Sequence, residues 1–142
     1  MGGDFSVVVR PTQFLIRTNA MIELLDGFPD YVVAVNCTGR ITRSDYEQSL
    51  IPAVEAALKE HKKVRLLYRA GSEFQGIEPS AVLEDVKVGF SHLSRWERVA
   101  VVTDIEWIRL AIRAFSFMIP GTVKFFRLSD ESDARRWISE PQ

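Results

Sequence analysis

The chain has 142 residues, of which 46% are hydrophobic, and its formal net charge at pH 7 is -1. This length suffices for one domain with a sizeable core, and the charge balance excludes the basic footprint of a nucleic-acid-binding protein. The single cysteine, Cys37, excludes an intramolecular disulfide, and the apolar runs fall short of the roughly 20 residues that span a bilayer.

The first 20 residues differ in pattern from the rest, because their short apolar runs are split by Arg10 and Pro11. They also lack the continuous apolar region of a signal peptide, which indicates a cytoplasmic protein. We expect an N-terminal extension over residues 1–20 and one domain over residues 21–142. The alternative is that parts of the extension add edge strands to the sheet.

A hairpin and a helix are expected next. Residues 22–25 and 31–37 are apolar or β-branched and flank a turn-rich segment, so they predict an antiparallel hairpin. Residues 44–47, Ser-Asp-Tyr-Glu, match a capping box, and the core-facing positions that follow at helical spacing are Tyr46, Leu50, Ile51, Val54, Ala57 and Leu58. Pro52 predicts a kink in this helix or, alternatively, a break with the main helix beginning near it.

The middle of the chain predicts a strand over residues 63–69, a loop over residues 70–77 and a helix opening at Pro79. One face of that helix carries Val82, Leu83, Val86, Phe90 and Leu93. The strand and the helix before it form a right-handed crossover of the kind that joins parallel strands. A buried strand is predicted over residues 99–103.

The helix predicted over residues 105–119 has almost no polar face. Residues 103–106, Thr-Asp-Ile-Glu, match a capping box, and Glu106, Arg109, Arg113 and Ser116 fall on one narrow stripe. All the other positions are apolar, whereas an ordinary surface helix needs an apolar arc of roughly 100°. The excess surface must therefore meet a partner, a ligand or a lipid surface, unless the helix is wedged between the sheet and a neighbouring helix.

The C-terminal part predicts a strand over residues 123–128 and a helix capped by Ser129, anchored by Ala134, Trp137 and Ile138. The expected order of elements is ββαβαβαβα. This order is typical of a single α/β domain whose sheet is mostly parallel, with at most one antiparallel hairpin.

Three segments carry a resemblance to a known family: MIELLDGFPDYVVAVNCTGRITRSDYEQSLIPAVEAAL, KVRLLY and RWERVAVVTDIEWIRLAIRAFSFMIPGTVKFF. From Met21 onward the chain resembles the SpoIIAA-like family, small bacterial proteins related to the STAS domains of anti-anti-sigma factors. The resemblance implies a mixed sheet with helices packed mainly on one side, and movable helices that expose an apolar surface. No enzymatic activity is established for this family, so the resemblance suggests none for the chain.

A phosphorylation switch is weakly supported. The STAS-type switch that the resemblance suggests uses an Asp-Ser-Ser/Thr-Gly pattern, which the loop from Arg69 to Gly76 lacks. Ser72 is a candidate phosphoacceptor there, although a plain turn residue is the favoured interpretation. The same loop has glycines at phosphate-loop spacing, but Ile77 and Glu78 stand where a lysine and a hydroxyl are required, which excludes nucleotide binding.

Other reactive residue types have ordinary structural explanations. His61 and His92 lack ligands at metal-binding spacing, and Cys37 suits a small buried filler at a strand end. Asp104 and Asp130 are expected at the carboxyl edge of the sheet, where their positions in first helical turns explain them. No nucleophile–base pair or metal set assembles, so we expect neither an enzyme nor a cofactor.

The sequence therefore predicts a non-enzymatic binding module that holds an apolar small molecule or a membrane lipid, with peripheral membrane association. The alternative is a STAS-like protein–protein regulatory module or a homodimer that uses the same apolar helix. The predicted binding residues are Trp107, Leu110, Phe117, Phe90, Leu93, Arg109 and Arg113.

Overall fold

The structure is a computed structural model that describes residues 21–81 and 93–142, apart from the side chains of Leu93 and Phe115. The predicted extension over residues 1–20 and the apolar face over residues 82–92, with Phe90 and His92, lie outside the described residues. The helix predicted at Pro79 does begin there and is described through Ala81.

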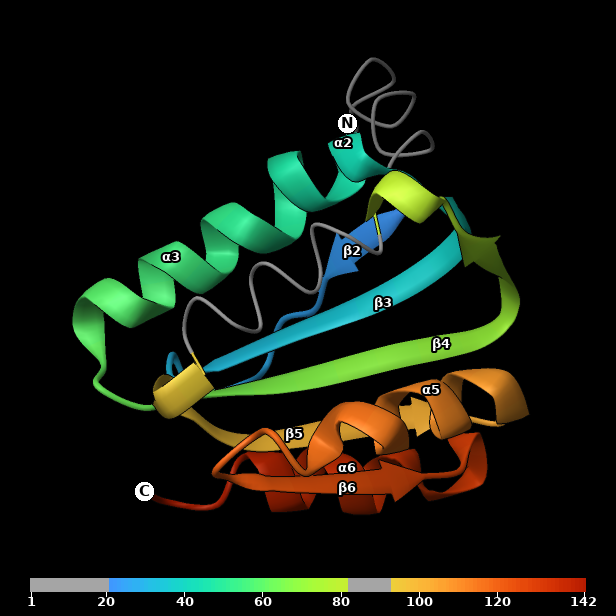
Figure 1. Cartoon of the computed structure of the whole chain (residues 1–142). Helices are drawn as coiled ribbons and strands as arrows, with labels where there is room; N and C mark the ends of the chain where they lie inside the picture. The colour runs from blue at the N-terminus through green and yellow to red at the C-terminus, as the bar shows by residue number, and fades with distance from the viewer. Residues whose placement is uncertain (1–20, 82–92) are drawn as a thin grey trace, which may run out of the picture.

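A five-stranded sheet in the order β2-β3-β4-β5-β6 organises the described part of the chain (Figure 1). β2 pairs with β3 antiparallel, and the pairs β3–β4, β4–β5 and β5–β6 are parallel. The strands are β2 (Ile22–Leu24), β3 (Val32–Ile41), β4 (Val64–Ile77), β5 (Trp96–Thr103) and β6 (Thr122–Phe126). The predicted hairpin and the mostly parallel sheet are confirmed.

The helices divide unevenly between the two faces of this sheet. On one face lie α2 (Arg43–Asp45), a π-helical turn (Tyr46–Leu50), α3 (Ile51–Glu60) and α5 (Glu106–Ser116). On the other face lies α6 (Glu131–Ile138), which follows a 3-10 turn at Leu128–Asp130. Figure 1 shows α5 and α6 on opposite sides of β5 and β6. The predicted fold class, with helices mainly on one side, is confirmed.

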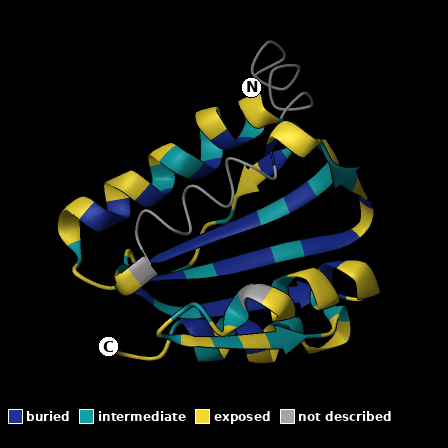
Figure 2. Ribbon diagram, in the orientation of Figure 1, coloured by how far each residue is buried: buried dark blue, intermediate teal, exposed yellow. Residues whose placement is uncertain are grey.

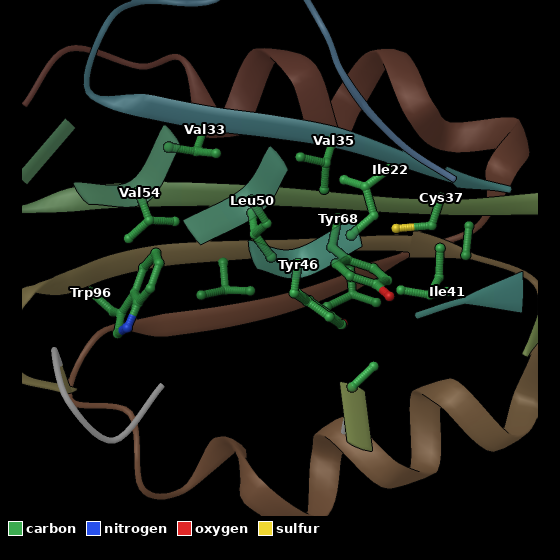
Figure 3. Close-up of a cluster of buried hydrophobic side chains, with 14 of the residues drawn as sticks. Ile22, Val33, Val35, Cys37, Ile41, Tyr46, Leu50, Val54, Tyr68 and Trp96 are labelled. Atoms are coloured by element: carbon green, nitrogen blue, oxygen red, sulfur yellow. The ribbon is translucent and has the colours of Figure 1, made fainter. Parts of the chain in front are cut away.

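The larger core fills the space between the sheet and the helices on its first face (Figure 3). It holds alternate residues of the strands, because successive side chains of a strand point to opposite faces. Figure 3 labels Ile22, Val33, Val35, Cys37, Ile41, Tyr46, Leu50, Val54, Tyr68 and Trp96 in this core. The intervening strand residues, such as Leu67 and Val102, form a smaller core against Ala134 and Ile138 of α6.

Strands β3 and β4 run further than the sequence indicated. They stay paired beyond Cys37, with register shifts on either side of Gly39, so that Arg40 lies opposite Gly76 and Ile41 opposite Ile77. Gly39 and Gly76 have φ angles of 61° and 147°, which glycine adopts without strain. The predicted loop over residues 70–77 is therefore wrong, because the irregular pairing lets two glycine-containing segments continue as strands.

The first helix begins two residues before its predicted cap. Thr42 is the N-cap: its hydroxyl accepts from the Asp45 amide at 3.2 Å, and an Asp45 carboxylate oxygen accepts from the Thr42 amide at 2.7 Å. Ser44 is exposed inside the helix, so the predicted cap at that residue is wrong. A capping box therefore exists here, but it uses the pair Thr42 and Asp45.

The helix continues past Pro52 through a widened turn instead of a break. The Ile51 amide donates to the Tyr46 carbonyl, which is the i to i+5 spacing of a π-helix. Pro52 follows directly after this turn, at the start of α3. The predicted break at Pro52 is therefore wrong, although α3 itself does begin next to it, at Ile51.

Two further predicted caps are wrong. Thr103 is still a residue of strand β5, and α5 begins at Glu106, so residues 103–106 form no capping box. Ser129 lies in the 3-10 turn before α6, and Asp130 is the residue at the N-cap position. In both places the strand or turn before the helix occupies residues that, by sequence alone, resemble a helix start.

Candidate functional site

Helix α5 leaves the sheet through a fixed turn. The buried Thr103 hydroxyl donates to the Ala70 carbonyl at 2.7 Å and accepts from the Ile105 amide at 3.1 Å. These bonds fix the chain direction at the end of β5, where the Ile105 carbonyl then accepts from the Arg109 amide at 3.3 Å. Thr103 is therefore important for placing α5, although it does not cap it.

One side of α5 packs on the larger core. Ile108 is 3% exposed, and Ile112, Ile105 and Ile119 are partly buried against the same core. These residues are three, four or seven positions apart and form one stripe along the helix and its ends. The sheet therefore buries an apolar stripe of α5 that is as wide as the buried stripe of an ordinary surface helix.

The opposite side of α5 is apolar and exposed (Figure 2). The exposed fractions are 53% for Trp107, 61% for Leu110 and 82% for Phe117, and Ala114 between them is also exposed. At about 100° per residue these four positions share one side of the helix, opposite Ile108 and Ile112. We call Trp107, Leu110, Ala114 and Phe117 the α5 ridge. The alternative, a helix wedged between the sheet and a neighbouring helix, stays a prediction, because residues 82–92 lie outside the described residues.

The two arginines of α5 lean toward strand β6 and leave the ridge without charge. The Arg109 and Arg113 guanidinium carbons lie 5.6 Å and 5.1 Å from the centre of the Phe125 ring, within cation–π range. Arg109 also donates to the Thr103 carbonyl at 3.3 Å. Each guanidinium therefore covers part of Phe125 and lies beside the ridge.

Trp107 has one aromatic neighbour at the end of β4. Its ring centre lies 6.0 Å from that of Phe74, with the planes tilted by 39°. Phe74 is 8% exposed and belongs to the segment that the sequence assigned to a loop, so its role was missed. This contact limits the positions that the Trp107 ring takes at the edge of the ridge.

The remaining predicted binding residues are not brought to the ridge by the described structure. Phe90 lies outside the described residues, and Leu93 begins a 3-10 turn (Leu93–Arg95) in which its side chain is not described. The predicted closure of a pocket by these two residues stays a prediction. Ser72 is exposed within β4 instead of a loop, and its modification also stays a prediction.

The other residues that the sequence singled out have contacts or positions that explain them structurally. An Asp104 carboxylate oxygen accepts from the Leu128 amide at 3.1 Å, and Asp130 stands at the N-cap of α6. The His61 Nε2 atom lies 3.3 Å from a carboxylate oxygen of Asp30, and Cys37 is buried in the larger core. Among residues 21–81 and 93–142, no three histidine, cysteine or acidic side chains are grouped to hold a metal ion.

Sequence reasoning missed a set of arginine–carboxylate pairs on the second face of the sheet. The buried Arg65 side chain donates to Glu97 at 2.7 Å and to the Ile138 carbonyl at 3.0 Å. The Arg69 side chain donates to Glu131 at 2.8 Å, which attaches α6 to strand β4. The paired residues lie far apart in sequence, so no local pattern indicates them.

In the part of the chain that the structure describes, no helix has the length and apolarity needed to cross a bilayer.

Comparisons with known proteins agree on one fold family. A family model described as SpoIIAA-like matches residues 32–139. Among solved structures, the chain is similar to an uncharacterized protein of the DUF3478 family from Shewanella loihica PV-4, whose crystal structure has a SpoIIAA-like fold. The sequence identity is 30%, the match covers 82% of this chain and 91% of that one, and the TM-score is 0.64. No curated protein matches the chain.

Proposed function

This chain belongs to the SpoIIAA-like family, and from that premise we propose that it is a non-enzymatic module that docks on a membrane surface through the α5 ridge. One observation carries the proposal: Trp107, Leu110 and Phe117 stand exposed on the side of α5 that faces away from the core. Large apolar side chains gathered on one exposed side of an element mark interaction surfaces in soluble proteins.

Apolar burial supplies the binding energy. Complete burial of one large apolar side chain is worth about 1.5–3 kcal/mol, so three such residues supply on the order of 6 kcal/mol before the costs of association. The three are already 53%, 61% and 82% exposed, so docking requires no unfolding of the helix to make them available. Binding of this strength is reversible.

The shape and chemistry of the ridge favour a lipid surface over an enclosed small molecule. The ridge lies on the outside of a helix and is convex, and a convex surface enters the boundary between headgroups and acyl chains but cannot enclose a ligand. Trp107 has the ring type that is enriched at that boundary. Arg109 and Arg113 lie beside the ridge, at the depth where they would meet lipid phosphates.

Vesicle flotation tests the proposal. We expect the wild type to float with phosphatidylcholine vesicles and with vesicles that also contain phosphatidylserine, and the Leu110→Ser, Phe117→Ser variant to stay unbound. The difference between the two vesicle types should be small, because α5 carries two arginines and one glutamate.

Leu24→Ser is the matched control, because Leu24 is 50% exposed on strand β2, in a different element from the ridge. This variant should float like the wild type. If the wild type does not float, or if the double variant floats equally well, membrane docking through α5 is wrong. A protein partner that protects the ridge would then be the remaining interpretation.

A further inference from the structure

Two oppositely charged residues lie along one flank of helix α5. Glu106 and Arg113 form no ion pair among the described residues, and both are exposed. They are seven positions apart, which is two helical turns and about 10.5 Å along the axis, too far for contact with each other. Both project on the same side of the α5 ridge, the side toward β6, where Arg113 lies over Phe125.

This arrangement is self-complementary. When two identical helices pack antiparallel about a two-fold axis, a given flank of one helix meets the same flank of the other. If the axis passes beside Leu110, midway between the two charged residues, each Glu106 faces Arg113 of the second copy. A parallel pairing brings opposite flanks together and leaves these charges unpaired.

We propose that the chain self-associates as a two-fold dimer in which the α5 ridges pack antiparallel, closed on one flank by two reciprocal Glu106–Arg113 ion pairs. Leu110 lies at the centre of this interface. The Arg113 guanidinium lies over the Phe125 ring and its side chain donates no hydrogen bond to the described residues, so its donors stay available for a carboxylate.

The size of the surface sets the strength of this dimer. A stable interface buries about 800 Å² on each partner, whereas a helix of 11 residues is about 16 Å long. We therefore expect a weak dimer, with a dissociation constant between about 10 μM and 1 mM. Such a dimer hides the ridge reversibly in water, and its existence does not depend on the proposed lipid binding.

Sedimentation equilibrium without lipid tests the proposal, over concentrations from about 10 μM to 1 mM. The wild type should shift from monomer toward dimer across this range. Glu106→Arg and Arg113→Glu each place two like charges together, so each should weaken the dimer at least about tenfold. The double variant with both changes restores opposite charges and should dimerise like the wild type. Glu23→Arg, an exposed charge reversal on β2, is the control and should leave the dimer unchanged.

Three results would overturn the proposal: a wild type that stays monomeric, single reversals that dimerise normally, or a charge swap that fails to restore the dimer while its thermal unfolding matches the wild type. Because Glu106→Arg leaves the ridge and both arginines of α5 intact, this variant should still float with vesicles. A wild type that floats but stays monomeric would reject the self-association alone.

Discussion

At the scale of single residues, the tightest constraint lies where the chain turns from α5 into β6. Gly121 has no side chain, and a Cβ atom placed on it would lie 2.5 Å from the Trp96 carbonyl oxygen and closer still to that of Glu97. Backbone atoms of a central strand cannot retreat as a flexible side chain can. This position therefore requires glycine for space.

We expect Gly121→Ala to lower the free energy of unfolding by about 1–3 kcal/mol, because the methyl group forces β5 and β6 apart. Gly71→Ala is the comparison variant and should lose less stability, since a Cβ there would meet only a side-chain atom, Nη1 of Arg69, 3.0 Å away, which has to yield by a few tenths of an ångström while it donates to Asn36. Urea unfolding of both variants checks the prediction. Equal stability of the two variants would contradict the close approach at Gly121.

At the scale of elements, the first helix shows how a correct motif was placed on the wrong residues. Thr42 and Asp45 form the reciprocal cap, while the equally plausible Ser44 lies exposed in the helix. Strand β3 runs to Ile41, so the helix must begin at the next residue. The extent of the strand therefore selects one of two overlapping sequence patterns.

Thr42→Ala should lower the free energy of unfolding by about 1 kcal/mol, because the Asp45 amide loses its side-chain acceptor at the helix start and the Asp45 carboxylate loses the hydroxyl that donates to it. Ser44→Ala should change it by no more than about 0.5 kcal/mol, as expected for an exposed helical position. Thermal unfolding followed by circular dichroism measures both. A larger loss for Ser44→Ala than for Thr42→Ala would mean that the cap is the one predicted from the sequence.

At the scale of the whole molecule, three arginine–carboxylate pairs lie on the second face of the sheet: one joins β4 to β5, and the other two join α6 and the C-terminal residues to the sheet. They are Arg65 with Glu97, Arg69 with Glu131 and Arg98 with Glu140. Burial is the largest single influence on Glu97 and Glu131 and opposes their ionisation. Hydrogen bonds and the charges of the neighbouring arginines, together with a hydrogen bond from Gln142 to Glu97, outweigh it and hold each pKa below the ordinary 4.5. For Glu140 the hydrogen bond from Arg98 is the main cause of its lowered pKa.

These shifts predict the dependence of stability on pH. A carboxyl group with a lowered pKa in the folded state stabilises the fold above its unfolded pKa, and this contribution is lost as pH falls through the folded pKa. The unfolding temperature should therefore change little from pH 7 to about pH 5. It should then decrease as the pH is lowered further, from about pH 4.5 downward.

Thermal unfolding between pH 7 and pH 3 checks this prediction. Glu131→Gln should unfold at a lower temperature near pH 7 and show a shallower fall in acid, because Arg69 and Arg135 lose their charged partner. Glu23→Gln, on the exposed side of β2, should follow the wild-type profile. A wild-type profile that is flat down to pH 3 would contradict the contribution of these pairs.

Much of the fold was predictable because its signals are local. Alternation and apolar runs predicted the hairpin and the sheet strands, and helical spacing predicted the stripes of α3, α5 and α6. The apolar excess of α5 was also visible, since it depends only on residue types around one helix. The length of β4 was not predictable, because Ser72 and Glu73 resemble turn residues and stay in the strand only through the pairing of Ala70 and Phe74, on either side of them, with β3.

The sequence by itself determined the kinds of element, their order and the candidate surface, because these depend on neighbours within a few residues along the chain. Only the tertiary structure decided that the sheet covers one stripe of α5 and leaves Trp107, Leu110 and Phe117 exposed. It also decided that Arg109 and Arg113 lie on Phe125, and that Arg65 and Arg69 bind carboxylates of distant segments. Contacts of this kind join residues that only the packed sheet brings together, so no spacing along the chain encodes them.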